Sequence, residues 1–311
     1  MLDLASPTAT GGPAARFTDA LAQHGYCVIR NAMGIDHVER TLSDLRPHFD
    51  ETPASVGAFY GASTRRFHAL LGRSSTIECY VSHPLILKIA RDILTACDNI
   101  QLNLTQAIQI DPGGEAQPPH RDQDMWPVHA PDTEYLINVM WPFTDYTAEN
   151  GGTIIWPGSH RQLEQIVLPA EQAIVPHLLP GDALIFLGST LHAGGANITN
   201  MSRRGMIISY SLGWLKPYEL PWLAYPPEIA RRFHPNVAAL AGYRAHRPNL
   251  GTHEGRCPSY LLLQDQRGSL GAIDTLRPEQ EALIAAYRRG DFDPSPEEPR
   301  PLFLFGSEGQ G

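Results

Sequence analysis

Residues 99–111 read NIQLNLTQAIQID, and the hydropathy pattern of the chain changes at this stretch. Apolar residues occupy alternate positions in this stretch, and this alternation is typical of a β-strand with one buried face. These residues are Ile100, Leu102, Leu104, Ile108 and Ile110. Gln106 interrupts this face. A buried amide is unfavourable unless it is hydrogen-bonded, so we expect Gln106 either to line a pocket or to form a hydrogen bond in the core.

Short apolar segments with glycine- or proline-containing turns follow. They are EYLINVMWPF (134–143), GGTIIWPGSH (151–160), GDALIFLG (181–188) and RGMIISYSLGW (204–214). Many short strands joined by such turns predict a β-sandwich or a β-barrel. The fold class that we expect is therefore mainly β, with flanking helices.

The residues before this region are mainly helical in pattern. We expect helices at 14–25, ended by Gly25, at 34–49 and at 84–97, one strand at 26–32, and a late helix at 277–290. No segment reads as a linker between domains. We therefore predict one domain over residues 1–311, with a helical part (1–98), a β-core (99–216) and a C-terminal extension that packs on the core (217–311).

Composition limits the classes of function. The formal net charge is −9, and such an acidic chain is not expected to bind nucleic acid or an anionic membrane in general. No secretory leader or membrane-spanning apolar run is visible, and the isolated cysteines suit a reducing compartment. We expect a cytoplasmic protein whose partner is a small molecule.

The stretch QPPHRDQDMWP (117–127) contains a pair of metal-binding residue types. In a strand, His120 and Asp122 would point to one face, and His192 in the glycine-rich STLHAGG segment is the best third ligand. In a strand, Asp124 would point to the same face as His120, but Asp122 is closer to His120 in the sequence and is therefore the better candidate ligand. Two histidines and one carboxylate form the open metal site of non-haem Fe(II) oxygenases, whereas structural zinc prefers four closed ligands.

An arginine pair lies eleven residues after His192. We expect the glycine turn and the following strand to form a hairpin that returns one arginine to the metal site. A guanidinium binds a carboxylate through parallel hydrogen bonds, as a 2-oxo acid cosubstrate would require. Strand alternation sends Arg203 and Arg204 to opposite faces, and it leaves the choice between them open.

These motifs together resemble the phytanoyl-CoA dioxygenase family. The matching segments are QPPHRDQDMW, ENGGTIIWPGSHR and PGDALIFLGSTLHAGGANIT, followed by the arginine. The resemblance implies a double-stranded β-helix (jelly-roll, cupin-like) core and an enzyme that uses Fe(II), 2-oxoglutarate and O2. It is closer to the branch that acts on natural products than to the acyl-CoA branch.

The resemblance also implies residue roles. His120, Asp122 and His192 would bind iron, and Arg203 would bind the distal carboxylate of 2-oxoglutarate. Gln117 resembles a family position near this cosubstrate, although a turn glutamine is an equal interpretation. In related halogenases a small residue replaces the iron-binding carboxylate, so Asp122 favours oxygenation or desaturation.

Two further side chains are candidates on their position alone. We interpret Thr153 as pointing toward the cosubstrate, although a β-branched residue is also common in a strand without any function. We interpret Trp126 as touching the substrate, and the alternative is that it is a core residue. Two other functions remain: a Zn or Mn jelly-roll enzyme for isomerisation or hydrolysis, and a ligand-binding barrel without activity. Family analogy suggests a homodimer.

Overall fold

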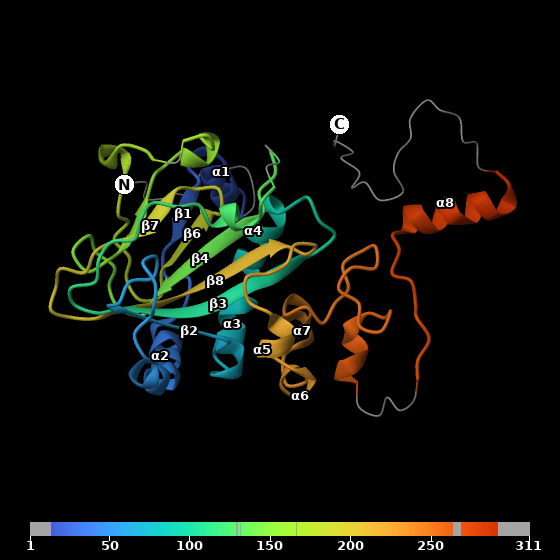
Figure 1. Cartoon of the computed structure of the whole chain (residues 1–311), viewed down its shortest axis with the longest axis horizontal. Helices are drawn as coiled ribbons and strands as arrows, with labels where there is room; N and C mark the ends of the chain where they lie inside the picture. Colours follow the sequence, from blue (N-terminus) through green and yellow to red (C-terminus); the bar gives the residue numbers. More distant parts are fainter. Residues whose placement is uncertain (1–13, 129, 131, 166, 264–268, 292–311) are drawn as a thin grey trace.

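The computed structural model describes residues 14–128, 130, 132–165, 167–263 and 269–291. Within these residues, antiparallel strands form a six-stranded sheet in the order β1-β6-β4-β8-β3-β2 and a two-stranded sheet, β5-β7 (Figure 1). The strands are β1 (Tyr26–Ile29), β2 (Thr64–His68), β3 (Ile100–Ile110), β4 (Leu136–Pro142), β5 (Thr153–Ile155), β6 (Ala183–Leu187), β7 (His192–Gly194) and β8 (Arg203–Leu212). This two-sheet β architecture with flanking helices confirms the predicted fold class, although the strands do not close into a barrel.

Helices precede and follow the β-core. They are α1 (Ala15–His24), α2 (Ile35–Glu51), α3 (Ile77–Val81), α4 (Pro84–Ile93), α5 (Pro221–Ala224), α6 (Pro227–Ala230), α7 (Pro235–Leu240) and α8 (Pro278–Arg289). Gly25 ends α1 in a left-handed conformation, with φ of 79°, which glycine adopts without steric cost. The helix expected at 84–97 is shorter than predicted, because it ends at Ile93.

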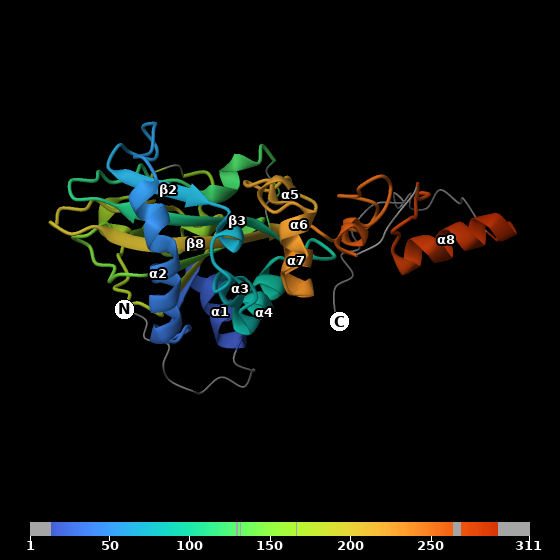
Figure 2. The ribbon, with the colours of Figure 1, turned by 90° about the horizontal axis from the view of Figure 1, so that it is seen from below.

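One face of the large sheet is covered by the N-terminal helices (Figure 2). The main core lies between these layers, and it joins helix residues such as Leu21 and Leu45 to strand residues such as Val139 and Ile208. A second apolar cluster lies on the other face of the sheet, around Met140 and Phe186. Both faces of the large sheet are therefore buried, and the second face lines a cavity.

A β-bulge in β3 corrects the prediction that its alternate apolar residues share one face. The pairing register with β8 shifts between Leu102 and Leu104. Residues before the shift, Ile100 and Leu102, belong to the helix-side core, whereas Leu104, Ile108 and Ile110 belong to the cavity-side cluster. An extra residue in one strand reverses the direction of every later side chain.

Strand β2 is absent from the predicted elements. It pairs antiparallel with β3, with Arg66 opposite Ile108. Between residue 14 and the start of β3, the structure therefore has two strands and not one. This edge strand brings a part of the N-terminal region to the cavity.

One part of the C-terminal extension packs on the main core, and another part lies apart from the sheets. Phe233, Val237 and Leu240, in and before α7, are part of the main core. Helix α8 lies apart from the sheets in both ribbon views (Figures 1 and 2), although Arg277 just before it forms an ion pair with Asp98 at 3.0 Å. Residues 264–268 and 292–311 of this extension lie outside the described part.

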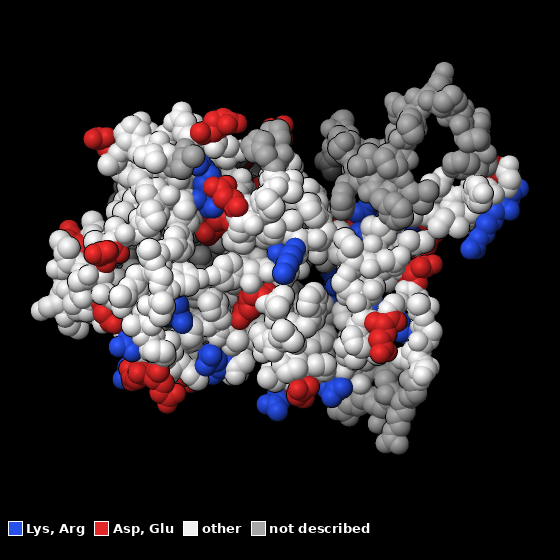
Figure 3. All heavy atoms as spheres, viewed as in Figure 1, with Lys and Arg blue, Asp and Glu red and all other residues white. Residues whose placement is uncertain are grey.

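Charged side chains of both signs are interspersed on the face shown in Figure 3. Among the residues that the structure describes, no helix is long and apolar enough to cross a membrane.

Candidate metal centre

Two histidines face each other across a short antiparallel bridge at the cavity wall. His120 and His192 exchange both backbone hydrogen bonds, at 2.9 Å and 3.0 Å. Directly opposed residues in an antiparallel pair project to the same side, and the centres of the two imidazole rings are 4.3 Å apart. The fold thus brings together two candidate ligands that are 72 positions apart in the sequence.

Asp122 reaches the same point from a 3-10 helix, Asp122–Met125. The expected strand geometry is therefore wrong at this residue, although the convergence that it predicted is found. The intervening Arg121 turns away, as expected, and its buried guanidinium donates to the carbonyls of Ser189, Ser159, Gln162 and Gln165. The bond to Ser189 (2.9 Å) ties the segment that bears His120 and Asp122 to the loop before His192.

The donor atoms of these three residues form a site that fits a metal ion. One atom of each lies within 4.8 Å of the others, and the Asp122 carboxylate is 3.6 Å from His120 Nε2 and 3.5 Å from His192 Nε2. Each imidazole donates through Nδ1 to a carbonyl, of Pro118 at 2.9 Å and of Thr190 at 3.0 Å. The Nε2 lone pairs are thus left to bind a metal, which is the usual arrangement of histidine ligands.

Burial also favours the metal-binding form of His192. Desolvation lowers its pKa to about 4, because the charged imidazolium is disfavoured inside the protein, while Asp122 acts in the opposite direction. His192 is therefore neutral at physiological pH. A neutral imidazole has the free lone pair that coordination requires.

Arg203 lies in the same cavity, at the first residue of β8. Its guanidinium is buried and packs on the Tyr146 ring, with 3.6 Å from Cζ to the ring centre. Its Nε atom has no hydrogen-bond partner, and among the described residues no carboxylate lies within ion-pair distance of Arg203. A buried cation without an anion is costly, so this position suits an acidic ligand.

The predicted hairpin between His192 and Arg203 is wrong. Strand β7 pairs only with β5 among the described strands, whereas β8 pairs with β3 and β4 in the other sheet. The connection between them crosses from one sheet to the other, so His192 and Arg203 approach from different sheets. Arg204 points to the opposite face, where it donates to Gln109 at 2.6 Å, and this resolves which arginine enters the cavity.

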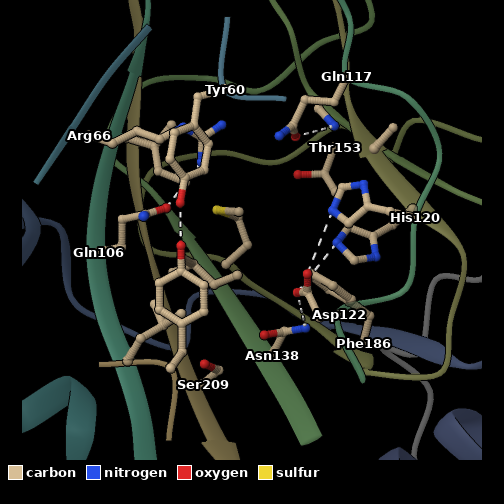
Figure 4. Close-up of a pocket in the computed structure, with 18 of the residues that line it drawn as sticks. Tyr60, Arg66, Gln106, Gln117, His120, Asp122, Asn138, Thr153, Phe186 and Ser209 are labelled. Carbon is tan, nitrogen blue, oxygen red and sulfur yellow. Dashed lines mark hydrogen bonds and ion pairs between the residues drawn. The ribbon is translucent and has the colours of Figure 1, made fainter. Parts of the chain in front are cut away.

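Gln117 and Thr153 both line the cavity on the side of the small sheet (Figure 4). The Gln117 amide accepts from the Gly194 N–H at 3.0 Å and donates to the Phe59 carbonyl at 3.2 Å. Thr153 is buried in β5, and its side chain points into the space between the histidines and the opposite wall.

The wall opposite the metal ligands contains a second arginine, Arg66 (Figure 4). It donates to the Gln106 side chain at 3.1 Å, and the Gln106 amide in turn donates to His68 Nε2 at 2.6 Å. Gln106 thus lines the pocket and is also hydrogen-bonded, so both interpretations of this residue describe it. The mostly buried Arg66 Nε has no partner, and burial lowers the pKa of Arg66 to about 10.

Sequence reasoning missed Arg66, because the short strand TRRFH has no clear alternation. It also missed Asn138, a buried amide within the apolar segment LINVMWP. The signal that singled out Gln106, a polar residue within an apolar strand, was equally present at Asn138. Trp126 does not line the cavity, since its ring packs edge-on against Tyr135 and its N–H donates to the Lys216 carbonyl at 2.9 Å.

Glu134 is hydrogen-bonded to the loop before His192, and its ionisation makes the stability of the protein depend on pH. Its carboxylate accepts from the Ser189 N–H at 3.1 Å and from the Ser189 hydroxyl at 2.5 Å. Burial raises its pKa from 4.5 to about 7, despite these hydrogen bonds. The folded protein thus holds this proton more tightly than the unfolded chain, and the stabilisation is complete below pH 4.5 and lost as pH rises through 7.

We therefore expect the free energy of unfolding of the native protein to fall, relative to that of Glu134→Gln, as pH rises from 4.5 to about 7. The expected relative change is about 3 kcal/mol, from about 1.4 kcal/mol per unit of pKa. Urea titrations of both proteins at several pH values measure it. Parallel pH profiles for the two proteins would show that Glu134 has no raised pKa.

A jelly-roll cavity where two imidazoles, a carboxylate and an unpaired arginine converge defines the class of mononuclear non-haem metal oxygenases. The chain belongs to the phytanoyl-CoA dioxygenase family, whose family model (Phytanoyl-CoA dioxygenase, PhyH) matches residues 21–205. Its relatives include the dioxygenase FrzG of Cladobotryum sp (31% identical, 77% of this chain and 88% of that protein) and the dioxygenase peniF of Penicillium patulum (30% identical, 81% and 86%). The chain is therefore a 2-oxoglutarate-dependent dioxygenase, as the resemblance implied.

Solved structures agree on the fold. The α-ketoglutarate-dependent epimerase SnoN from nogalamycin biosynthesis, solved with Fe3+, α-ketoglutarate and nogalamycin RO, is 18% identical. It matches 68% of this chain and 88% of its own, with a TM-score of 0.55. The comparisons give no support to a zinc or manganese enzyme for isomerisation or hydrolysis.

Proposed function

We propose that His120, Asp122 and His192 hold Fe(II), that Arg203 binds the distal carboxylate of 2-oxoglutarate, and that the enzyme oxidises an unactivated C–H bond of a small, moderately apolar natural product. The observation that carries this assignment is the convergence of the three donor groups within 4.8 Å in a cavity that also contains a buried, unpaired guanidinium. When bound, the iron and the oxo acid supply, together with O2, the oxidising power, and succinate and CO2 are released.

The protein's own residues orient these groups. Arg203, at the first residue of β8, offers two parallel hydrogen bonds to a carboxylate, and the hydroxyl of Thr153, in the same cavity lining, can donate to the same ligand. Gln117 fixes the strand of His192 through the Gly194 N–H. Arg66, on the opposite wall, supplies a second positive charge that favours a doubly anionic cosubstrate.

The remaining lining indicates the substrate class. The cavity is concave and partly open to solvent, as small-molecule sites are. Its walls are largely apolar, through Leu104, Met140, Phe186 and Ile207, and such a surface excludes water and favours an apolar substrate. The hydroxyl groups of Tyr60 and Tyr218, two residues of the cavity lining, contact each other and can bind a polar substituent.

Names of related proteins also support a natural product. Several relatives are dioxygenases of filamentous fungi, and the structural neighbour named above, SnoN, belongs to nogalamycin biosynthesis. We further propose one domain, a cytoplasmic location and a homodimer, which rest on the sequence and on family analogy.

The experiment is a substrate panel with the iron-loaded protein, in which succinate formation is measured against 2-oxoglutarate alone. We expect polycyclic, oxygenated apolar metabolites to stimulate turnover, and long-chain acyl-CoA thioesters to leave it at the basal rate. Stimulation by acyl-CoA thioesters alone would contradict the proposed substrate class. Turnover of a substrate without consumption of 2-oxoglutarate would contradict the reaction itself.

A further inference from the structure

We infer that Asn138 is the positioning residue of the metal centre: it holds the Asp122 carboxylate so that a single carboxylate oxygen is presented to the metal. Its side chain donates from Nδ2 to Asp122 Oδ2 at 2.9 Å (Figure 4). A carboxylate only accepts hydrogen bonds, so the amide nitrogen must face it. This inference rests on the proposed assignment of Asp122 as a ligand.

The environment of Asn138 shows that its amide is not explained by the fold. Asn138 is 1% exposed in the central strand β4, and the residues on the same side of this strand, Leu136 and Met140, are apolar. A buried amide without a partner destabilises a protein. The hydrogen bond to Asp122 therefore gives this polar side chain its role.

Each of the three ligands has one orienting partner. His120 and His192 are fixed through Nδ1 by the carbonyls of Pro118 and Thr190. Asp122 has no comparable backbone partner among the described residues, and Asn138 is its one hydrogen-bond donor there. Without that bond the carboxylate could rotate about its terminal torsion, which is a soft one.

The orientation matters because the two carboxylate oxygens are almost equally close to the imidazoles. Oδ1 lies 3.6 Å from His120 Nε2 and Oδ2 lies 3.5 Å from His192 Nε2, so either oxygen, or both, could bind the same ion. An octahedral ion with two imidazoles and one carboxylate oxygen keeps three positions open for cosubstrates. If both oxygens bound, one of these positions would be lost. The hydrogen bond to Oδ2 occupies one of its lone pairs and favours binding through Oδ1.

The test is a double-mutant cycle that measures Co(II) affinity and the ligand-field spectrum of the Co(II) protein, without catalysis. Asn138→Leu should weaken Co(II) binding by about 10- to 100-fold and alter the spectrum, as loss of an orienting partner does. In an Asp122→Asn background the same substitution should change the affinity by no more than about 2-fold, because Asn138 acts through that carboxylate. Asn138→Ala repeats the cycle if the leucine variant fails to fold.

Ser209→Ala is the matched control. Ser209 is paired with Asn138 across strands β4 and β8 and lines the same cavity, but it bonds to Asn103 and not to Asp122. We expect its Co(II) affinity and spectrum to equal those of the native protein. Native affinity and spectrum in both Asn138 variants, or an equal loss in Ser209→Ala, would overturn the inference. If Asp122→Asn itself binds Co(II) normally, the ligand assignment is wrong, and this outcome is distinct from the first.

Discussion

Asp122→Ala is expected to abolish succinate formation and to leave the fold intact. The substitution removes the only carboxylate of the described metal site, so the ion loses a ligand and the charge that balances it. The side chain is partly exposed, and Asn138 loses one hydrogen bond, so the melting temperature should change by only a few degrees. Succinate formation by the iron-loaded variant, with circular dichroism to follow unfolding, measures both effects.

Asp124→Ala is the control for this experiment. Asp124 lies in the same 3-10 helix and was the alternative ligand in the sequence, but its side chain is not part of the converging group. We expect native turnover from this variant. Normal succinate formation by Asp122→Ala, or its loss in Asp124→Ala alone, would remove Asp122 from the metal site.

Arg203→Ala is expected to raise the KM for 2-oxoglutarate by about 100- to 4000-fold. Loss of one partner of a buried charge pair costs about 3–5 kcal/mol, and each 1.4 kcal/mol corresponds to a tenfold change in affinity. Arg203→Lys keeps the charge but loses the forked geometry, and it should give an intermediate KM. Initial rates over a range of 2-oxoglutarate concentrations measure these values.

Arg204→Ala provides the matched control, because Arg204 is the next residue on β8 and its side chain lies on the opposite face with Gln109. Its KM for 2-oxoglutarate should be that of the native enzyme. Full activity of Arg203→Ala at low 2-oxoglutarate would contradict the cosubstrate site.

The sequence predicted those features that depend on local pattern. Short apolar segments between glycine and proline turns indicated the strands, and Gly25 correctly marked the end of α1. The spacing of His120 and Asp122 and the position of His192 identified the residues that converge, although Asp122 reaches the site from a 3-10 helix. The strands and the end of α1 were predictable because their signals are local, whereas His192 was identified by its residue type and its glycine-rich segment.

Features that depend on long-range pairing could not be predicted in this way. The bulge between Leu102 and Leu104 leaves the alternation of the sequence intact while it divides the strand between two cores. Nothing in the segment after His192 indicates that the chain crosses to the other sheet, so the hairpin was a natural but wrong expectation. Arg66 reaches the cavity only because β2 pairs with β3, and this pairing has no local signal.

Joint binding of Fe(II) and 2-oxoglutarate in this cavity can be measured by anaerobic titration of the iron-loaded protein with 2-oxoglutarate. A chelated oxo acid gives Fe(II) a visible charge-transfer absorption, and no substrate is needed to observe it. We expect this absorption to appear and saturate in the native protein, to be lost in His192→Ala, and to require a much higher 2-oxoglutarate concentration in Arg203→Ala. No absorption in the native protein, or an unchanged titration in both variants, would show that the cavity does not bind Fe(II) and 2-oxoglutarate together.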